Sequence, residues 1–129
     1  MGDEAALPGD DTNLENAYTA QNVTDVATSD GTRVEQTGTG EYMIHQFKDF
    51  VGSQTSVTLT CIGQSSLASD TSTVYLEIYN QNTTDWDLVD SDSSTAADTN
   101  FTLTGAVADL TNYKDGRNVI SCRVYQLAT

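Results

Sequence analysis

Two short runs of alternating apolar and polar residues, joined by a polar turn, constrain the fold of this chain most strongly. In the first run, Val74, Leu76 and Ile78 alternate with two tyrosines and a glutamate. After the turn, Trp86 and Leu88 alternate with aspartates. Successive side chains of a β-strand point to opposite faces, so the pattern predicts an antiparallel hairpin with one buried face. It also predicts that Trp86 lies in the core.

Similar runs recur along the chain, separated by turn-forming residues at intervals of roughly ten residues, which is typical of a β-sandwich or barrel. The length of 129 residues suits one domain. We predict an all-β protein built as a single antiparallel β-sandwich of about eight strands, the number in a jelly roll. The expected strands are 22–27, 32–37, 42–48, 56–62, 73–80, 86–90, 100–104 and 118–125.

Residues 1–16 have a different composition from the rest of the chain. They are acidic, contain the only proline, Pro8, and have few apolar side chains beyond Leu7 and Leu14. We predict an extended N-terminal arm here, followed by the sandwich domain at 17–129. The two leucines are candidate anchors for packing the arm on a neighbouring subunit, and a frayed terminus is the alternative.

The charge balance excludes several classes of partner. Nineteen acidic and five basic side chains give a formal net charge of −14, which repels nucleic-acid phosphates and anionic membranes. No run approaches the roughly 18 apolar residues of a membrane span, so we expect no membrane insertion. The first residues lack the basic and apolar regions of a signal peptide, and nothing in them directs secretion.

The two cysteines, Cys61 and Cys122, each fall in an apolar alternating series, so both thiols are expected to point inward. A disulfide between them would stabilise the fold by about 4 kcal/mol in the chain-entropy model. In a reducing compartment they would be small buried apolar groups. Without a signal peptide we favour free thiols, with the disulfide as the alternative.

Catalytic groups are scarce. A serine or cysteine nucleophile needs a neighbouring base, and the only histidine is His45, which lies in a predicted strand with no evident partner. One histidine and two inward-facing cysteines do not form a zinc ligand set. We therefore predict that the protein is not an enzyme.

Four aspartates provide a candidate metal site. In Asp85 and Asp87, and again in Asp90 and Asp92, the two-residue spacing places both carboxylates on one face of an extended chain, as a calcium site requires. The chain lacks the EF-hand order of ligands, and an acidic chain produces such pairs by chance. We expect no cofactor, with calcium as the alternative.

Sugar-binding sites commonly stack a sugar ring on an exposed aromatic side chain. Tyrosines on the outer face of a sheet more often form cross-strand pairs, so we favour a structural role, with sugar binding as the alternative. The candidates are Tyr75, Tyr79, Tyr113 and Tyr125.

Residues 72–126 resemble the second half of galactose-binding-domain-like jelly rolls. The resemblance depends on the hairpin 74–89, on Leu103, and on the segments 110–113 and 119–124. It implies a β-sandwich module used for attachment to carbohydrates or surfaces, with ligands bound in loops at one end. The resemblance lies in the pattern of the strands and does not identify any ligand-binding residue in this chain.

The chain also resembles bacteriophage virion accessory proteins, such as capsid decoration or head- and tail-fibre modules. The resemblance lies in its richness in serine, threonine, asparagine and aspartate without a secretion signal. We predict a non-enzymatic structural module on a virion surface, assembled in the host cytoplasm, with capsid or tail proteins as partners and a homo-oligomeric state. The alternative is a carbohydrate-binding module of a secreted, extracellular protein that binds surface glycans, with or without calcium.

Overall fold

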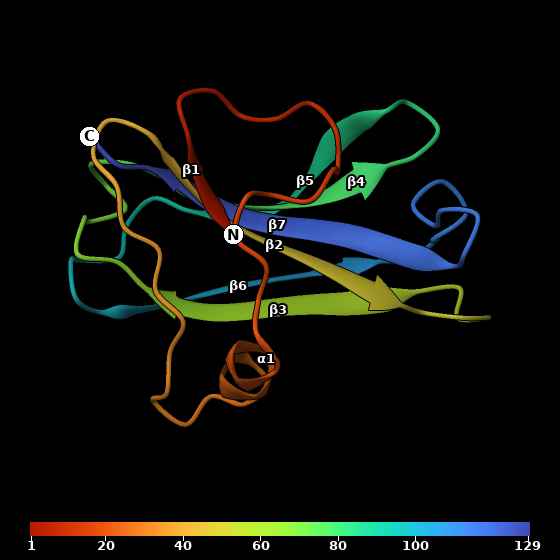
Figure 1. The fold of residues 1–129 in the computed structure, drawn as a ribbon, viewed down its shortest axis with the longest axis horizontal. Helices are drawn as coiled ribbons and strands as arrows, with labels where there is room; N and C mark the ends of the chain where they lie inside the picture. The colour runs from red at the N-terminus through yellow and green to blue at the C-terminus, as the bar shows by residue number, and fades with distance from the viewer.

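The computed structural model describes all 129 residues and contains seven β-strands and one short helix. The elements are β1 (Gly2–Glu4), α1 (Ala20–Val26), β2 (Tyr42–Phe50), β3 (Val57–Gln64), β4 (Val74–Asn80), β5 (Asp85–Asp92), β6 (Asn100–Val107) and β7 (Val119–Leu127). The strands form a five-stranded antiparallel sheet in the order β1-β2-β7-β4-β5 and a two-stranded sheet of β3 and β6. The two sheets pack as layers (Figure 1). The predicted all-β sandwich is confirmed, and the arrangement is compatible with a jelly roll.

The core is the apolar layer between the two sheets. It centres on side chains of β4, β6 and β7, with Ile78, Leu103 and Ile120 at most 2% exposed. Leu110, in the loop after β6, is fully buried and closes one end of this layer. Each such side chain contributes about 1.5–3 kcal/mol through removal of apolar surface from water, so this layer accounts for the pairing of the sheets.

The register of the β4–β5 hairpin reverses the predicted orientation of Trp86. Trp86 pairs with Tyr79 and Leu88 pairs with Glu77, and directly opposed residues of an antiparallel pair share a face. Trp86 therefore lies on the outer face of the larger sheet, and Leu88 is 60% exposed. Farther from the turn, Leu76 pairs with Asp90, so Val89 forms a β-bulge without a partner. The predicted core position of Trp86 is wrong.

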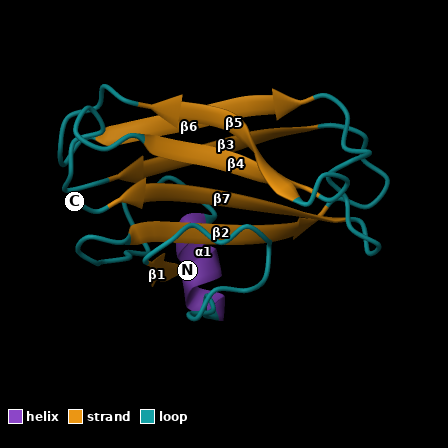
Figure 2. Cartoon of the chain, turned by 90° about the horizontal axis from the view of Figure 1, so that it is seen from above, coloured by secondary structure: helices purple, strands orange, loops and turns teal.

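Two predicted strands are absent. Residues 22–27 lie mostly in α1, because a capping box begins a helix there: the Thr19 side chain accepts a hydrogen bond from the Asn22 backbone, and the Asn22 side chain accepts one from the Thr19 backbone. Residues 32–37 have no regular secondary structure. The helix lies below β3 in Figure 1, so that it overlaps β2 when the molecule is viewed from above (Figure 2). No helix has the length and apolar character that a membrane span requires.

Residues 1–16, the predicted arm, lie against the sandwich. Residues 2–4 form β1 and pair with β2. The chain then arches over β7 and β4, on the side away from the smaller sheet (Figure 1). It returns to its starting point, where the Asn16 backbone N–H donates to the Met1 carbonyl at 3.0 Å. The arm is therefore a closed loop across the outer face of the larger sheet.

Both cysteines are free. Cys122 packs in the core cluster with Ile78 and Ile120, and Cys61 packs at the edge of the neighbouring cluster. Burial raises the pKa of both thiols, that of Cys122 to about 12. Few thiolates therefore form at neutral pH, and both residues act as small apolar core groups.

The close approach of β5 and β6 depends on Gly105. A Cβ at this position would lie 2.5 Å from Val89 Cγ1 and 3.1 Å from the Val89 carbonyl oxygen. Because a backbone atom would have to move, Gly105→Ala is expected to lower the free energy of unfolding by about 1–3 kcal/mol in urea titrations. Gly116→Ala is the control, because nothing lies within 4 Å of its added Cβ. Equal effects of the two substitutions would contradict the prediction.

Candidate functional site

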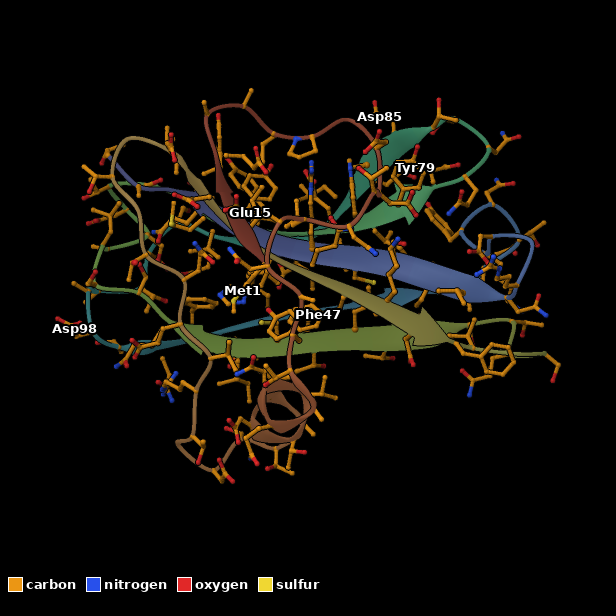
Figure 3. The ribbon with its side chains drawn as sticks, in the orientation of Figure 1. Met1, Glu15, Phe47, Tyr79, Asp85 and Asp98 are labelled. Carbon is orange, nitrogen blue, oxygen red and sulfur yellow. The ribbon has the colours of Figure 1, made fainter.

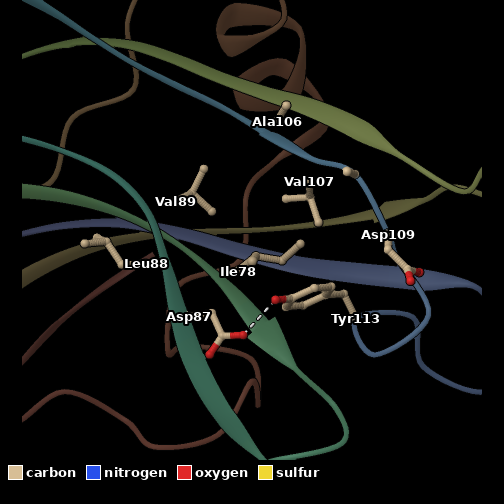
Figure 4. Close-up of a pocket in the computed structure, with 9 residues that line it drawn as sticks. Ile78, Asp87, Leu88, Val89, Ala106, Val107, Asp109 and Tyr113 are labelled. Atoms are coloured by element: carbon tan, nitrogen blue, oxygen red, sulfur yellow. Dashed lines mark hydrogen bonds between the residues drawn. The ribbon is translucent and has the colours of Figure 1, made fainter.

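A pocket of about 320 Å³ opens where β5 and β6 separate, beside the loop that precedes β7. Its floor is apolar and includes Ile78, Val89 and Val107. Polar groups stand at its rim, with Asp87 on β5 and Asp109 and Tyr113 on the loop (Figure 4). The pocket combines an apolar surface with two carboxylates and a phenol, a combination that suits a ligand with an apolar face and several hydrogen-bond donors.

The carboxylate of Asp87 is held in place by two donors. The Tyr113 hydroxyl donates to its Oδ2 at 2.8 Å (Figure 4). Asn80 Nδ2 donates to the same oxygen at 3.0 Å. The hydrogen bond to Asp87 raises the pKa of Tyr113, so the phenol stays protonated. Because both donors bind Oδ2, Oδ1 of Asp87 stays available to a ligand.

Asp109 is ordered by its own loop. Its Oδ1 accepts hydrogen bonds from the Thr111 backbone N–H at 2.9 Å and from the Thr111 hydroxyl at 2.6 Å. These bonds lower the pKa of Asp109, so the carboxylate is ionised at neutral pH. The pocket therefore carries negative charge at its rim.

A second candidate site lies on the outer face of the larger sheet, around a buried cation. The side chain of Arg123 on β7 is 5% exposed, and its Nη2 lies 2.7 Å from Glu77 Oε2 on β4. The guanidinium also lies 4.2 Å from the centre of the Trp86 ring and 5.1 Å from that of Tyr125. Tyr125 donates its hydroxyl to Glu77 Oε1 at 3.0 Å. The charge is thus paired and enclosed by aromatic rings.

The arm covers this cluster, and side chains of the sheet bind its backbone carbonyl groups. Arg123 Nη1 donates to the Pro8 carbonyl at 2.8 Å, and the indole N–H of Trp86 donates to the Asp10 carbonyl at 3.3 Å. Such contacts recognise an extended backbone rather than particular side chains.

One side chain of the arm is also recognised. Asp11 Oδ2 accepts hydrogen bonds from the Ser121 hydroxyl at 2.7 Å and from Gln81 Nε2 at 3.4 Å. Gln46 Nε2 contributes to binding the backbone by donating to the carbonyls of residues 11 and 12 at 3.1 and 3.0 Å. We call this surface the arm groove; it is formed by Gln46, Gln81, Trp86, Ser121 and Arg123.

The structure separates the four tyrosines proposed from the sequence. Tyr113 lies at the pocket, and the other three lie on the outer face of the larger sheet. Tyr75 stacks on Tyr125 with ring centres 5.1 Å apart, and Tyr79 packs edge-on to Trp86 at 5.2 Å. Tyr79 and Tyr125 are buried. Figure 3 shows Tyr79 beside Asp85 at the β4–β5 end of the sheet.

The four aspartates proposed as calcium ligands are spread along β5 and bind different protein groups. Asp87 binds Tyr113 and Asn80, as described above. Asp85 and Asp90 each accept a hydrogen bond from the backbone N–H of the following residue, and Asp90 accepts another from that of Thr104. Asp92 accepts hydrogen bonds from a serine hydroxyl and a backbone N–H. No group of three or more histidine, cysteine or acidic side chains is placed to hold a metal ion.

His45 points into the molecule, where Tyr18 covers it. Its Nδ1 shares a hydrogen bond with the Tyr18 hydroxyl, and the Tyr18 ring stacks on Phe47 with centres 5.3 Å apart. Burial lowers the pKa of His45 to about 4. The contacts therefore give His45 a structural role, in which its neutral ring is part of the packing.

Stability is expected to fall between about pH 6.5 and pH 4 because of His45. The unfolded chain binds the proton near the ordinary pKa of 6.5, whereas the folded protein resists it until about 4. Acidification should lower the free energy of unfolding of wild type by roughly 2 kcal/mol more than that of His45→Gln, which lacks the titrating group. Urea titrations at pH 7 and pH 4.5 measure the difference. Parallel pH profiles of the two proteins would refute it.

Sequence reasoning placed none of Asp11, Gln46, Asp109 and Arg123 in a candidate site. The cation at Arg123, between the apolar Cys122 and Val124, was a usable signal, because a buried cation requires a partner. The other three become neighbours of a site only through the fold. Comparison with known proteins adds no relative: no family model, curated protein sequence or solved structure matches this chain.

Proposed function

We propose that the protein is a non-enzymatic structural module that works by binding other protein subunits, on a virion surface or a similar assembly formed in the host cytoplasm. Its partners are copies of itself and capsid or tail proteins. The observation that carries the proposal is the arm groove, because it is a protein surface built to bind an extended polypeptide through backbone carbonyls and one carboxylate.

Three further observations support this role. His45 is part of the packing rather than of a reactive site. Leu7 and Leu14, the proposed anchors, are only partly buried on their own subunit, which leaves apolar surface for a neighbour. The net charge of −14 keeps such a module soluble before assembly.

Particle composition tests the proposal. Particles purified from the source should contain the chain in many copies when they are analysed by quantitative mass spectrometry. Removal of residues 2–16 should weaken its incorporation while the circular dichroism spectrum remains that of a β-protein. A chain that occurs only as a free monomer, absent from any particle, would refute the proposal.

A carbohydrate-binding module of an extracellular protein is the second candidate, and the pocket is the observation that favours it. The Tyr113 ring borders an apolar floor between Asp87 and Asp109, and carboxylates beside an aromatic ring suit the hydroxyl groups and apolar face of a sugar. Asp87 Oδ1 is the expected acceptor for a sugar hydroxyl.

A glycan array distinguishes this candidate. If a sugar binds in the pocket, Asp87→Asn should weaken binding by about tenfold, the value of one lost charged hydrogen bond. Tyr75→Phe, on the opposite face of the sheet, should leave it unchanged. Repeating the array with a chelator tests the calcium requirement. The assembly proposal is favoured instead if no glycan binds.

A further inference from the structure

The arm groove recognises a segment that every copy of this chain carries. Its contacts are to the carbonyls of Pro8, Asp10, Asp11 and Thr12 and to the Asp11 carboxylate. None of these groups depends on which molecule supplies the segment. The same bonds therefore form whether residues 8–12 come from the same chain or from a second copy.

The arm is built as a unit that is separable from the domain. Its ends are tied to each other by the hydrogen bond between the Asn16 N–H and the Met1 carbonyl. The residue that follows this bond, Ala17, is exposed. Rotation at Ala17 can move the loop away from the domain while its internal bond stays intact.

The arm also packs loosely on its own domain along its returning half. A pocket of about 220 Å³ lies between residues 13–18 and the side chains of Gln46 and Lys48 on β2. Leu14 lines this pocket and is only partly buried. Unfilled space here means that fewer dispersion contacts hold the arm in place. The attachment consequently depends on the pairing of β1 with β2 and on the polar contacts of residues 8–12.

We propose that in the assembled state residues 8–12 of one copy occupy the arm groove of a second copy, so that neighbouring subunits exchange arms. This inference rests on the proposed function, because exchange requires copies held at high local concentration. Exchange replaces each intramolecular bond with an identical intermolecular one, so the balance depends on concentration and on hinge geometry. The net charge of −14 opposes close approach, and salt should favour exchange by screening it.

Two variants of the full chain, each with one added cysteine besides the native Cys61 and Cys122, test the exchange. Ser121 Oγ lies 2.7 Å from Asp11 Oδ2, so Asp11→Cys in one chain and Ser121→Cys in another bring thiols together only if the arm of the first lies in the groove of the second. We expect a disulfide-linked heterodimer after mild oxidation of the concentrated mixture. Its yield should be at least about ten times that of a control mixture in which Thr58→Cys takes the place of Ser121→Cys. Thr58 is an exposed residue of β3.

The double variant Asp11→Cys/Ser121→Cys controls for geometry, since at high dilution it should close within one chain. Two controls must first succeed: the double variant closes its disulfide, and native mass spectrometry shows that the chains assemble. Exchange is then refuted if the mixture gives no more heterodimer than the control mixture. That result leaves the proposed function standing. A wild-type chain that stays monomeric at every concentration refutes both.

A measurement on the unmodified chain covers the case in which a variant fails to fold. The Met1 amino group of the arm and the Lys48 side chain on β2 line the same pocket, so an amine-reactive bifunctional reagent can join them. In a mixture of ¹⁵N-labelled and unlabelled protein, exchange predicts cross-linked peptides with one labelled and one unlabelled partner, increasing with salt. Cross-links that join only peptides of the same label refute it.

Discussion

Replacing Arg123 with alanine is expected to lower the free energy of unfolding by about 3–5 kcal/mol. Arg123 and Glu77 form a buried ion pair, with their side chains 5% and 13% exposed. Removing the guanidinium leaves the Glu77 carboxylate away from water with only the Tyr125 hydroxyl as a donor, and an unpaired charge in such a place is costly. The substitution also removes the hydrogen bond to the Pro8 carbonyl that holds the arm.

Urea unfolding followed by the fluorescence of Trp86, the only tryptophan, measures this change directly, because the ring lies 4.2 Å from the guanidinium. Arg117→Ala is the matched control; its side chain is exposed, and its loss should cost no more than about 0.5 kcal/mol. The double variant with Glu77→Ala should be more stable than the sum of the two single losses implies. Additive losses would show that the ion pair contributes nothing.

The alternation of apolar and polar residues was sufficient to predict the sandwich. Strands β2 to β7 lie close to their expected positions, because a period-two pattern with one buried face permits one orientation of each strand. The hairpin of β4 and β5 was predicted for this reason, and so were the inward-facing cysteines.

The errors arise where a local feature overrides this pattern. The register of the β4–β5 hairpin pairs Trp86 with Tyr79 and Leu88 with Glu77 on the outer face, and a period-two pattern within each strand does not fix the register between them. At α1 the Thr19 capping box outweighs the β-branched residues that favoured a strand. Three outer-face tyrosines were found by alternation, but the contacts of Tyr79 with Trp86 and of Tyr125 with Arg123 depend on the hairpin register and on strand order.

The candidate sites were predicted less well than the fold because their residues are distant in sequence. Tyr113 and Asp87 were each proposed, for different roles, and the structure joins them in one hydrogen bond at the pocket. The arm groove joins residue 11 to residue 121. No spacing rule connects such pairs, since the contact exists only after β2, β4 and β7 have assembled into one sheet.

Replacing Leu103 with alanine is expected to lower the free energy of unfolding by about 2–5 kcal/mol. Leu103 on β6 is fully buried and packs in one core cluster with Leu76, Phe101 and Val124. The smaller sheet has only two strands, so its attachment depends on a few inward side chains, and the lost leucine leaves a cavity that the rigid strand pairing cannot close.

Leu88→Ala is the matched control for this substitution, because it removes the same atoms from a side chain that is 60% exposed. Its expected cost is within about 0.5 kcal/mol. Urea titrations of both variants should give similar slopes and different midpoints, since the area exposed on unfolding is nearly unchanged. If Leu103→Ala lowers the free energy of unfolding by less than about 1 kcal/mol, other contacts hold the smaller sheet. The close approach of β5 and β6 at Gly105 is the next contact to test.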